Sequence, residues 1–454
     1  MHKKNHIPVT NPEEIMQLLE GNDGSHKRLA GWSGYMQESD SGVSNKSLIL
    51  RCTKCKMNTS GIYRTPGDAE RRCPSCSSIL MHCPTCHSLV SATEKFSILT
   101  CDRCLDDFIT NTTIEYLASR DRGSHDIVIS GIRATGEMHI GNFLGAVRQF
   151  VEYEQSDNLC MYFIADWHTL TREIDPKRVS LNTIAIATDY LAAGLDPNRS
   201  IIYMQSSVPE ISELALYLSM IQKKNALEDL PTVKDLVKND GTMTMGHMLY
   251  PVLMAADILG TKATLVPVGA DQIPNIEFAR DLARKFNQQF GNTFVIPKAG
   301  PGMIKVPGLT GGKMGKSEST VSVWLSDSLK EISDKYTQFG VTDIKRRRRT
   351  DPGNPDDCAS VYPVFRILND KKGSLALDTI ASECKAGTRG CKECKIELAR
   401  EINCVTQPFR ERRKDLEHKP GYVKEVLYYG GLKVREIVKQ TLGEVRDKMG
   451  IVSI

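Results

Sequence analysis

The chain has 454 residues, enough for about two to four domains. Its 59 Lys and Arg nearly balance its 55 Asp and Glu, which excludes a general polycation and restricts any nucleic-acid surface to a local patch. No apolar run approaches the length of a membrane span, and the N-terminus lacks the apolar segment of a secretory signal. We therefore expect a cytoplasmic protein.

The first quarter of the chain is predicted to be a metal-binding module. Residues 1–46 are polar and predict a lead-in without visible chemistry. Residues 47–105 hold four CxxC pairs at the spacing of zinc knuckles, namely Cys52 and Cys55, Cys73 and Cys76, Cys83 and Cys86, and Cys101 and Cys104. Two knuckles complete one tetrahedral thiolate site, so we expect a double zinc ribbon with about two zinc ions. Sequential and interleaved pairing both remain open, as do a purely structural role and a nucleic-acid contact.

After a linker at 106–124, residues 125–325 alternate between β and α patterns. Strands are expected at 126–132, 160–164, 200–204 and 263–268, and helices from about 142 and at 180–195, 211–221, 249–259 and 272–286. A polar insert is expected near 222–250. The pattern predicts an α/β fold with a doubly wound, Rossmann-like parallel sheet, whose ligands bind beyond the carboxyl ends of the strands.

Two segments have the character of phosphate-binding loops. The first strand leads through a glycine-containing turn into His139-Ile-Gly-Asn142, where a helix opens and offers free backbone N–H groups. Far downstream, residues 311–317 read Gly-Gly-Lys-Met-Gly-Lys-Ser. Two lysines on a glycine-rich loop can close on a triphosphate and offset charge as pyrophosphate leaves.

Together these loops resemble the two signatures of the class I aminoacyl-tRNA synthetases. Residues 249–259, Leu-Tyr-Pro-Val-Leu-Met-Ala-Ala-Asp-Ile-Leu, and 266–272, Val-Pro-Val-Gly-Ala-Asp-Gln, resemble the tryptophan-specific branch of that family. The resemblance covers residues 127 to the C-terminus. It implies an enzyme that uses ATP with Mg²⁺ to activate L-tryptophan, transfers it to the 3′ adenosine of tRNA(Trp), and forms a homodimer near the insert.

The resemblance also implies roles for individual residues. The catalytic set would be His139, Asn142, Lys313, Lys316 and Ser317. ATP would be bound by Arg133, Ala134, Thr135, Gly141, Asn142, Gly269, Ala270, Asp271, Ile304, Lys313, Met314, Gly315, Lys316 and Ser317. Tryptophan would be bound by Tyr250, Met254, Asp257, Gln272 and His168. Asp257 would accept the indole N–H, because a buried carboxylate left unpaired rejects phenylalanine.

Three positions depart from the family pattern. Ala134 replaces a proline, which predicts a less rigid turn. Gly315 replaces a serine in the lysine loop, which removes a hydroxyl and adds flexibility. Ala270 replaces a glutamate, which removes one carboxylate beside the ribose.

Residues 326–454 predict a helical tRNA anticodon-binding domain. The five cations at 345–349 are either a solvated face or a contact to tRNA phosphates. Cys358, Cys384, Cys391 and Cys394 could hold zinc or an iron–sulfur cluster. Some tryptophan-specific synthetases carry a [4Fe–4S] cluster on a similar cysteine pattern, whose first gap is three residues shorter than here, so the resemblance favours the cluster. Cys404 is the reserve ligand, although its pattern fits a thiol buried on a helix.

Two rival functions remain open from the sequence. A tyrosyl-tRNA synthetase would share both signatures. A synthetase-like nucleic-acid-binding regulatory protein would use the zinc ribbons and keep the catalytic core as a scaffold, a reading that only Gly315 and Ala270 support.

Overall fold

The computed structural model describes residues 28–30, 32–37, 47–52, 58–60, 89–93, 98–100, 125–156, 158–171, 175–300, 304–312, 314, 321–369 and 375–452. The chain divides into two compact units, Met1–Tyr116 and Leu117–Ile454. In the described residues no helix has the length and apolar character needed to cross a bilayer.

The first unit contains two small antiparallel sheets. One has the order β1-β5-β6 and the other β2-β3-β4. Their bounds are β1 Arg28–Ala30, β2 Trp32–Gln37, β3 Ser47–Cys52, β4 Asn58–Ser60, β5 Leu89–Thr93 and β6 Ile98–Thr100. β1 pairs with β5, and β2 pairs with β3. The β-sheets of this unit therefore begin before residue 47, the boundary that the sequence predicted. β1 was not predicted from the sequence, because its partner β5 lies far along the chain. Nor was β2 predicted, which pairs with the next strand, β3.

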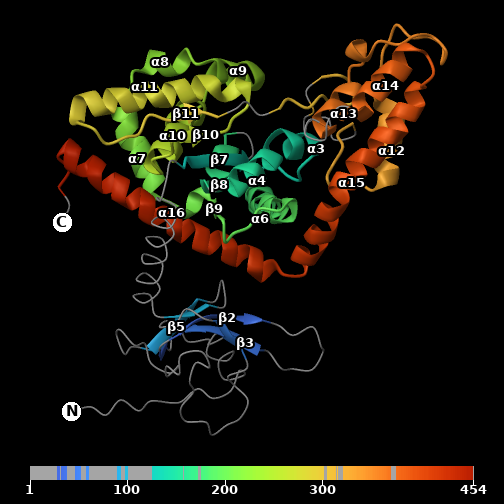
Figure 1. Cartoon of the computed structure of the whole chain (residues 1–454). Helices are drawn as coiled ribbons and strands as arrows, with labels where there is room; N and C mark the ends of the chain where they lie inside the picture. The colour runs from blue at the N-terminus through green and yellow to red at the C-terminus, as the bar shows by residue number, and fades with distance from the viewer. Residues whose placement is uncertain are drawn as a thin grey trace, which may run out of the picture. The chain divides into compact units, whose positions relative to one another are not determined.

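A five-stranded parallel sheet lies at the centre of the second unit (Figure 1). Its order is β11-β10-β7-β8-β9, and its bounds are β7 Ile127–Arg133, β8 Leu159–Ala165, β9 Ser200–Met204, β10 Leu265–Val266 and β11 Lys298–Ala299. The chain runs outward from β7 through β8 to β9, then returns to the other side of β7 to form β10. This reversal creates a crevice beyond the carboxyl ends of β7 and β10, where such sheets bind ligands.

Helices cover this sheet and continue into the C-terminal part. They are α3 Ile140–Asn142, α4 Arg148–Gln155, α5 Asp166–Thr169, α6 Pro176–Ala193, α7 Glu210–Met220, α8 Lys224–Glu228, α9 Pro231–Asp240, α10 Met245–Gly260, α11 Ile273–Phe290, α12 Leu329–Phe339, α13 Tyr362–Asn369, α14 Leu375–Lys385, α15 Cys391–Glu417 and α16 Pro420–Met449. A π-helical turn, Phe143–Val147, joins α3 to α4. The predicted α/β sheet and helical C-terminal part are thus confirmed. Within the parallel sheet only the two-residue β11 was not predicted. Among the helices α5 was not predicted, nor were α8 and α9, which lie in the polar insert.

The helical part is not a detached domain in this fold. One continuous buried core runs from β7 and β8 to α13 and α15, from Val128 and Tyr162 to Phe365 and Leu398. α16 crosses the sheet at β9 so closely that a Cβ on Gly430 would lie 1.9 Å from the carbonyl oxygen of Ile202. Side-chain packing therefore holds both α15 and α16 in fixed positions relative to the sheet.

Candidate active site

The turn after β7 is held by a buried hydrogen bond. Ala134 is completely buried, and its N–H donates to Oγ1 of Thr169 at 2.8 Å. Gly136 follows with φ of 103°, a conformation that favours glycine. A proline at position 134 would lack the N–H that makes this bond. The N–H of Ala134 thus supplies a restraint that a proline cannot make, and the lower rigidity of this turn stays a prediction.

His139 opens the helix that follows with a reciprocal cap. Its Nδ1 accepts the backbone N–H of Asn142 at 3.2 Å, and Oδ1 of Asn142 accepts the N–H of His139 at 3.2 Å. Because Nδ1 is an acceptor here, the neutral imidazole carries its proton on Nε2. His139 thus has the tautomer needed to donate Nε2–H to a phosphate oxygen.

The two signature segments contact each other. A Cβ on Gly141 would lie 2.9 Å from Nδ1 of His139 and 3.4 Å from Cβ of Met314, so glycine permits this close packing. Met314, from the lysine loop, is buried. Beyond that loop, His139 pairs with Trp324 in an antiparallel bridge. The predicted juxtaposition of the turn and the loop is therefore present.

Four residues of the lysine loop, Lys313, Gly315, Lys316 and Ser317, lie outside the described residues. Ile304, predicted to contact adenine, lies against the helix that follows His139. A Cβ on Gly145 would come within 2.7 Å of the Ile304 carbonyl oxygen. In the turn after β7, Arg133 is exposed and Thr135 is half-buried.

The residues predicted to face the ribose form the turn after β10. Gln272 N–H donates to the carbonyl oxygen of Gly269 at 2.8 Å, which closes the turn, while Ala270 and Asp271 are exposed. The hydroxyl of Ser130 on β7 donates to the carbonyl oxygen of Pro267 at 2.9 Å. The turns after β7 and β10 therefore flank the crevice at which the strand order reverses.

Asp257 forms the centre of a buried polar cluster. It is 1% exposed. Nε2 of Gln205 donates to its two carboxylate oxygens at 3.0 and 2.7 Å, and Nε2 of His168 lies 3.1 Å from Oδ2. Burial raises the pKa of Asp257, and the hydrogen bond from His168 opposes that shift. The sequence predicted Asp257 and His168 but missed Gln205, whose only signal was its position at the carboxyl end of β9.

A second polar group adjoins this cluster. Oε1 of Gln272 accepts the hydroxyl of Tyr250 at 2.9 Å and Nδ2 of Asn275 at 2.9 Å. The rings of Tyr250 and His168 meet edge to face at 5.0 Å. Met254 lies half-buried one turn after Tyr250 on α10. The structure therefore brings together all five residues predicted for tryptophan and adds Asn275, which is completely buried.

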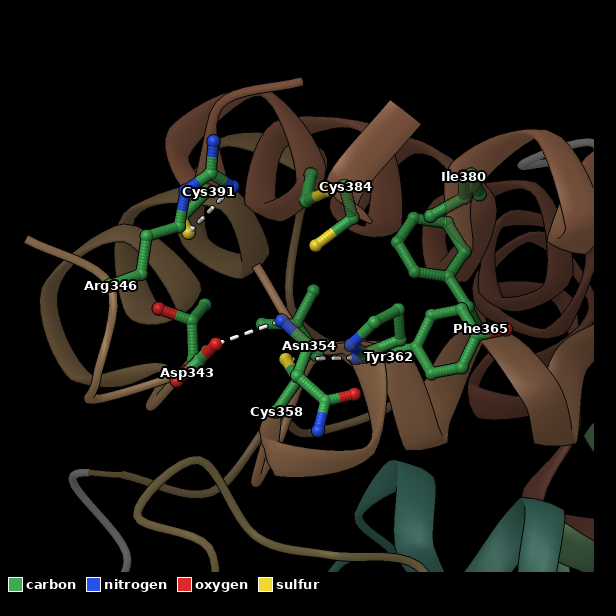
Figure 2. A pocket seen from close by; sticks show the side chains of 13 residues that line it. Asp343, Arg346, Asn354, Cys358, Tyr362, Phe365, Ile380, Cys384 and Cys391 are labelled. Atoms are coloured by element: carbon green, nitrogen blue, oxygen red, sulfur yellow. Dashed lines mark hydrogen bonds between the residues drawn. The ribbon is translucent and has the colours of Figure 1, made fainter. Parts of the chain in front are cut away.

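A separate pocket contains the four predicted cluster cysteines (Figure 2). Cys358, Cys384, Cys391 and Cys394 line this pocket together with apolar side chains of α13 and α14. Nη1 of Arg346 lies 3.8 Å from Sγ of Cys391, and burial raises the pKa of Cys394 to about 11. Among the described residues, no three His, Cys, Asp or Glu side chains are grouped as ligands of a metal ion. Cys404 is exposed and is not part of the lining, contrary to the expectation of a buried thiol.

Known proteins resemble most of this chain. The family model of class I tRNA synthetases (W and Y) matches residues 122–407. A tryptophan–tRNA ligase of Thermotoga maritima is 37% identical over 331 residues, which cover 71% of this chain and 99% of that protein. A corresponding ligase of Aquifex aeolicus is 34% identical, with the same two shares covered.

Solved structures agree with these matches. The tryptophanyl-tRNA synthetase of Campylobacter jejuni, crystallised with ADP and tryptophan, is 32% identical and superposes with a TM-score of 0.62. The superposition covers 71% of this chain and 99% of that one. The cysteine-rich segment 47–105 lies before the range that the family model matches.

Proposed function

This chain belongs to the class I tRNA synthetases for tryptophan and tyrosine and acts as an ATP-dependent tryptophan–tRNA ligase, and we propose that its buried Asp257 cluster selects the indole. The observation that carries this proposal is the orientation of Asp257. Gln205 and His168, from two other elements, fix its carboxylate within an apolar helix face. A fixed anionic acceptor fits the indole N–H of tryptophan. Phenylalanine has no ring donor, and tyrosine carries its hydroxyl donor at a different point of a smaller ring.

In the first half-reaction the tryptophan carboxylate attacks the α-phosphate of ATP, forming tryptophanyl-adenylate and releasing pyrophosphate. We assign the Nε2–H of His139 to the phosphates, supported by the tautomer that its cap with Asn142 imposes. Lys313 and Lys316, with Mg²⁺ bound to ATP, would offset the remaining phosphate charge. The protein supplies position and electrostatic stabilisation, and no covalent enzyme intermediate is required. In the second half-reaction the 3′ adenosine of tRNA(Trp) accepts the aminoacyl group.

The crevice between the turns after β7 and β10 is the proposed nucleotide site. Arg133, Ala134 and Thr135 lie on one side, and Gly269, Ala270 and Asp271 lie on the other. Ile304 would lie against the adenine, since its backbone packs on the helix after His139.

We propose that the four-cysteine pocket holds a [4Fe–4S] cluster. Its support is the donor set: four thiols from three segments, two of them on α15, share one apolar pocket with a guanidinium nearby. A single ion needs its ligands close together, whereas a cluster of four irons binds each thiolate to a different iron. Among the described residues these thiols are not grouped as ligands of a single ion, which favours the cluster over zinc. The bound cluster would fix the loop 345–358 against α14 and α15.

We propose two zinc ions in the N-terminal unit, bound by Cys52, Cys55, Cys73 and Cys76 and by Cys83, Cys86, Cys101 and Cys104. Seven of these cysteines lie outside the described residues; Cys52 ends β3. The pairing of β5 with β6 supports the second set. Ser91 opposes Thr100 in antiparallel register, and in the sequence Cys83 and Cys86 precede β5 while Cys101 and Cys104 follow β6.

The arginine-rich loop is proposed to contact tRNA. Lys345 pairs with Asp357, and Arg349 with Glu393, which uses part of the positive charge of this loop. Arg347 and Arg348 are exposed and have no ion pair within the described residues. Their guanidinium groups are thus available to phosphates.

A homodimer is proposed through α7 and the start of α10. Large apolar side chains are exposed to solvent there in the single chain, namely Leu216, Met220, Met243, Met245 and Leu249. Such a group of exposed apolar residues marks a protein interface. Sedimentation of the purified protein, with Met220→Lys as the disrupting variant, tests this proposal.

A further inference from the structure

Two arginines on α15 are connected to the two sides of the His139–Trp324 bridge, each through an aspartate. On the first side, Nε of Arg413 donates to Oδ1 of Asp189 at 2.7 Å. The other carboxylate oxygen of Asp189 accepts the backbone N–H of Met138 at 3.2 Å. Asp189 is 1% exposed on α6. One buried carboxylate therefore connects α15 to the residue directly before His139.

On the second side, Nη1 of Arg410 donates to the carbonyl oxygen of Asp327 at 2.8 Å. Oδ2 of Asp327 accepts the N–H of Trp324 at 2.8 Å. Arg410 and Arg413 lie three residues apart, so they share one face of the helix. The bridge itself is closed by N–H of Ile140 to the Val323 carbonyl oxygen at 2.8 Å.

We propose that Asp189 and Arg413, together with Asp327 and Arg410, are positioning residues that hold the two halves of the ATP clamp in register. The bridge joins the turn that carries His139 to the segment that follows the lysine loop. Its two residues come from parts of the sequence far apart, and α15 is connected to both sides through Asp189 and Asp327. The inference rests on the proposed role of His139 at the phosphates.

His139 can act on the phosphates only if its side chain is accurately placed. His139 must present Nε2–H to within a fraction of an ångström, and a misplacement of about 1 Å costs about a hundredfold in rate. The N–H of Met138 would be unpaired in the core without Asp189, and Asp189 would be an uncompensated buried charge without Arg413. The pair therefore fixes the main chain immediately before His139.

The test is tryptophan-dependent ATP–pyrophosphate exchange by full-length Arg413→Met, normalised to active sites by the burst of adenylate formation. We expect kcat per active site to fall by about tenfold to a hundredfold, with the KM for tryptophan changed less than about twofold. The KM for tryptophan should stay near the wild-type value because Asp257 and Gln205 do not contact Asp189 or Arg413. Arg413→Lys, which keeps the charge, should recover part of the loss.

Arg412→Met is the matched control. Arg412 is exposed on the same helix, and its Nε donates to the Ala192 carbonyl oxygen on α6 at 2.6 Å, but it does not contact the bridge. This variant should exchange like the wild type. Equal kcat per active site in Arg412→Met and Arg413→Met would overturn the inference, since loss of helix docking alone would then explain both.

If Arg413→Met does not fold, Arg410→Met tests the second side of the bridge. Its kcat per active site should also fall, and a kcat equal to that of Arg412→Met would overturn the inference. A wild-type protein without tryptophan-dependent exchange would contradict the proposed function. A wild type with exchange and unaffected bridge variants would contradict only the positioning role.

Discussion

Gln205 is oriented by His168 so that its amide N–H groups must face Asp257. Its Oε1 accepts the backbone N–H of His168 at 3.4 Å, which leaves Nε2 directed at the two oxygens of Asp257. A completely buried amide with both ends used in this way has one allowed orientation. The carboxylate predicted to bind the indole N–H is consequently held in a fixed orientation by Gln205 and His168.

Replacing Gln205 by Leu should weaken tryptophan selection. The change removes the donor to a buried carboxylate, a hydrogen bond worth about 1.5–3 kcal/mol. We expect kcat/KM for tryptophan in pyrophosphate exchange to fall by about tenfold to a hundredfold. Gln149, on α4 and outside the Asp257 cluster, offers a control: Gln149→Leu should retain wild-type selectivity. An unchanged kcat/KM in Gln205→Leu would show that the amide does not support Asp257.

Tryptophan binding should weaken at acidic pH. Burial raises the pKa of Asp257, so the anion is lost at a higher pH than for an exposed aspartate. The ionised form, the better acceptor for the indole N–H, is present above that pKa and is lost as the pH falls through it. We expect the KM for tryptophan to rise on acidification, and Asp257→Asn to have a high KM with no such pH dependence. A wild-type KM that is independent of pH down to the ordinary aspartate range would contradict this role.

Thr169→Val should destabilise the turn before His139. The change keeps the side-chain shape but leaves the buried N–H of Ala134 without its acceptor, at a cost of about 1–3 kcal/mol in unfolding free energy. Thr169→Ser, which keeps the hydroxyl, is the control. Denaturant unfolding measures the loss.

Ala134→Pro provides the cross-check on that prediction. Proline has no N–H to leave unpaired, so Thr169→Val should cost less in the Ala134→Pro background than in the wild type. Strictly additive effects of the two substitutions would argue against the hydrogen bond as the restraint.

The cysteine pocket should yield iron. Anaerobically purified protein should be brown and contain about four iron atoms per chain at this site, and Cys394→Ser should lose both. Cys404→Ser should keep them, because Cys404 is exposed and does not line the pocket. One tightly bound zinc in place of iron, lost in Cys394→Ser, would instead identify a zinc site.

The sequence predicted the parts of this protein that depend on local pattern. Buried strands such as β8 are continuous apolar runs, and Gly194 ends α6 in the left-handed conformation that glycine favours. The signature loops were recognisable because phosphate binding restricts their composition. Gln205 and Asn275 were not, because a glutamine after a strand or an asparagine on a helix acquires meaning only through partners far along the chain.

The same reason explains two further differences. The restraint on Ala134 depends on Thr169, 35 residues away, and the substitution alone suggested only a missing proline ring. The ion pair of Asp189 with Arg413 joins residues 224 positions apart, and a charged residue within a helix pattern suggests a solvated face. Contacts of this range follow from the packing of α15 on α6, which no local pattern encodes.

The central claim is tested most directly by charging a mixed tRNA pool with tryptophan or tyrosine, using the wild type and Asp257→Ala. The account predicts that the wild type charges tRNA with tryptophan and not with tyrosine, and that Asp257→Ala loses most of this activity. Charging with tyrosine by the wild type, or undiminished tryptophan charging by Asp257→Ala, would contradict it.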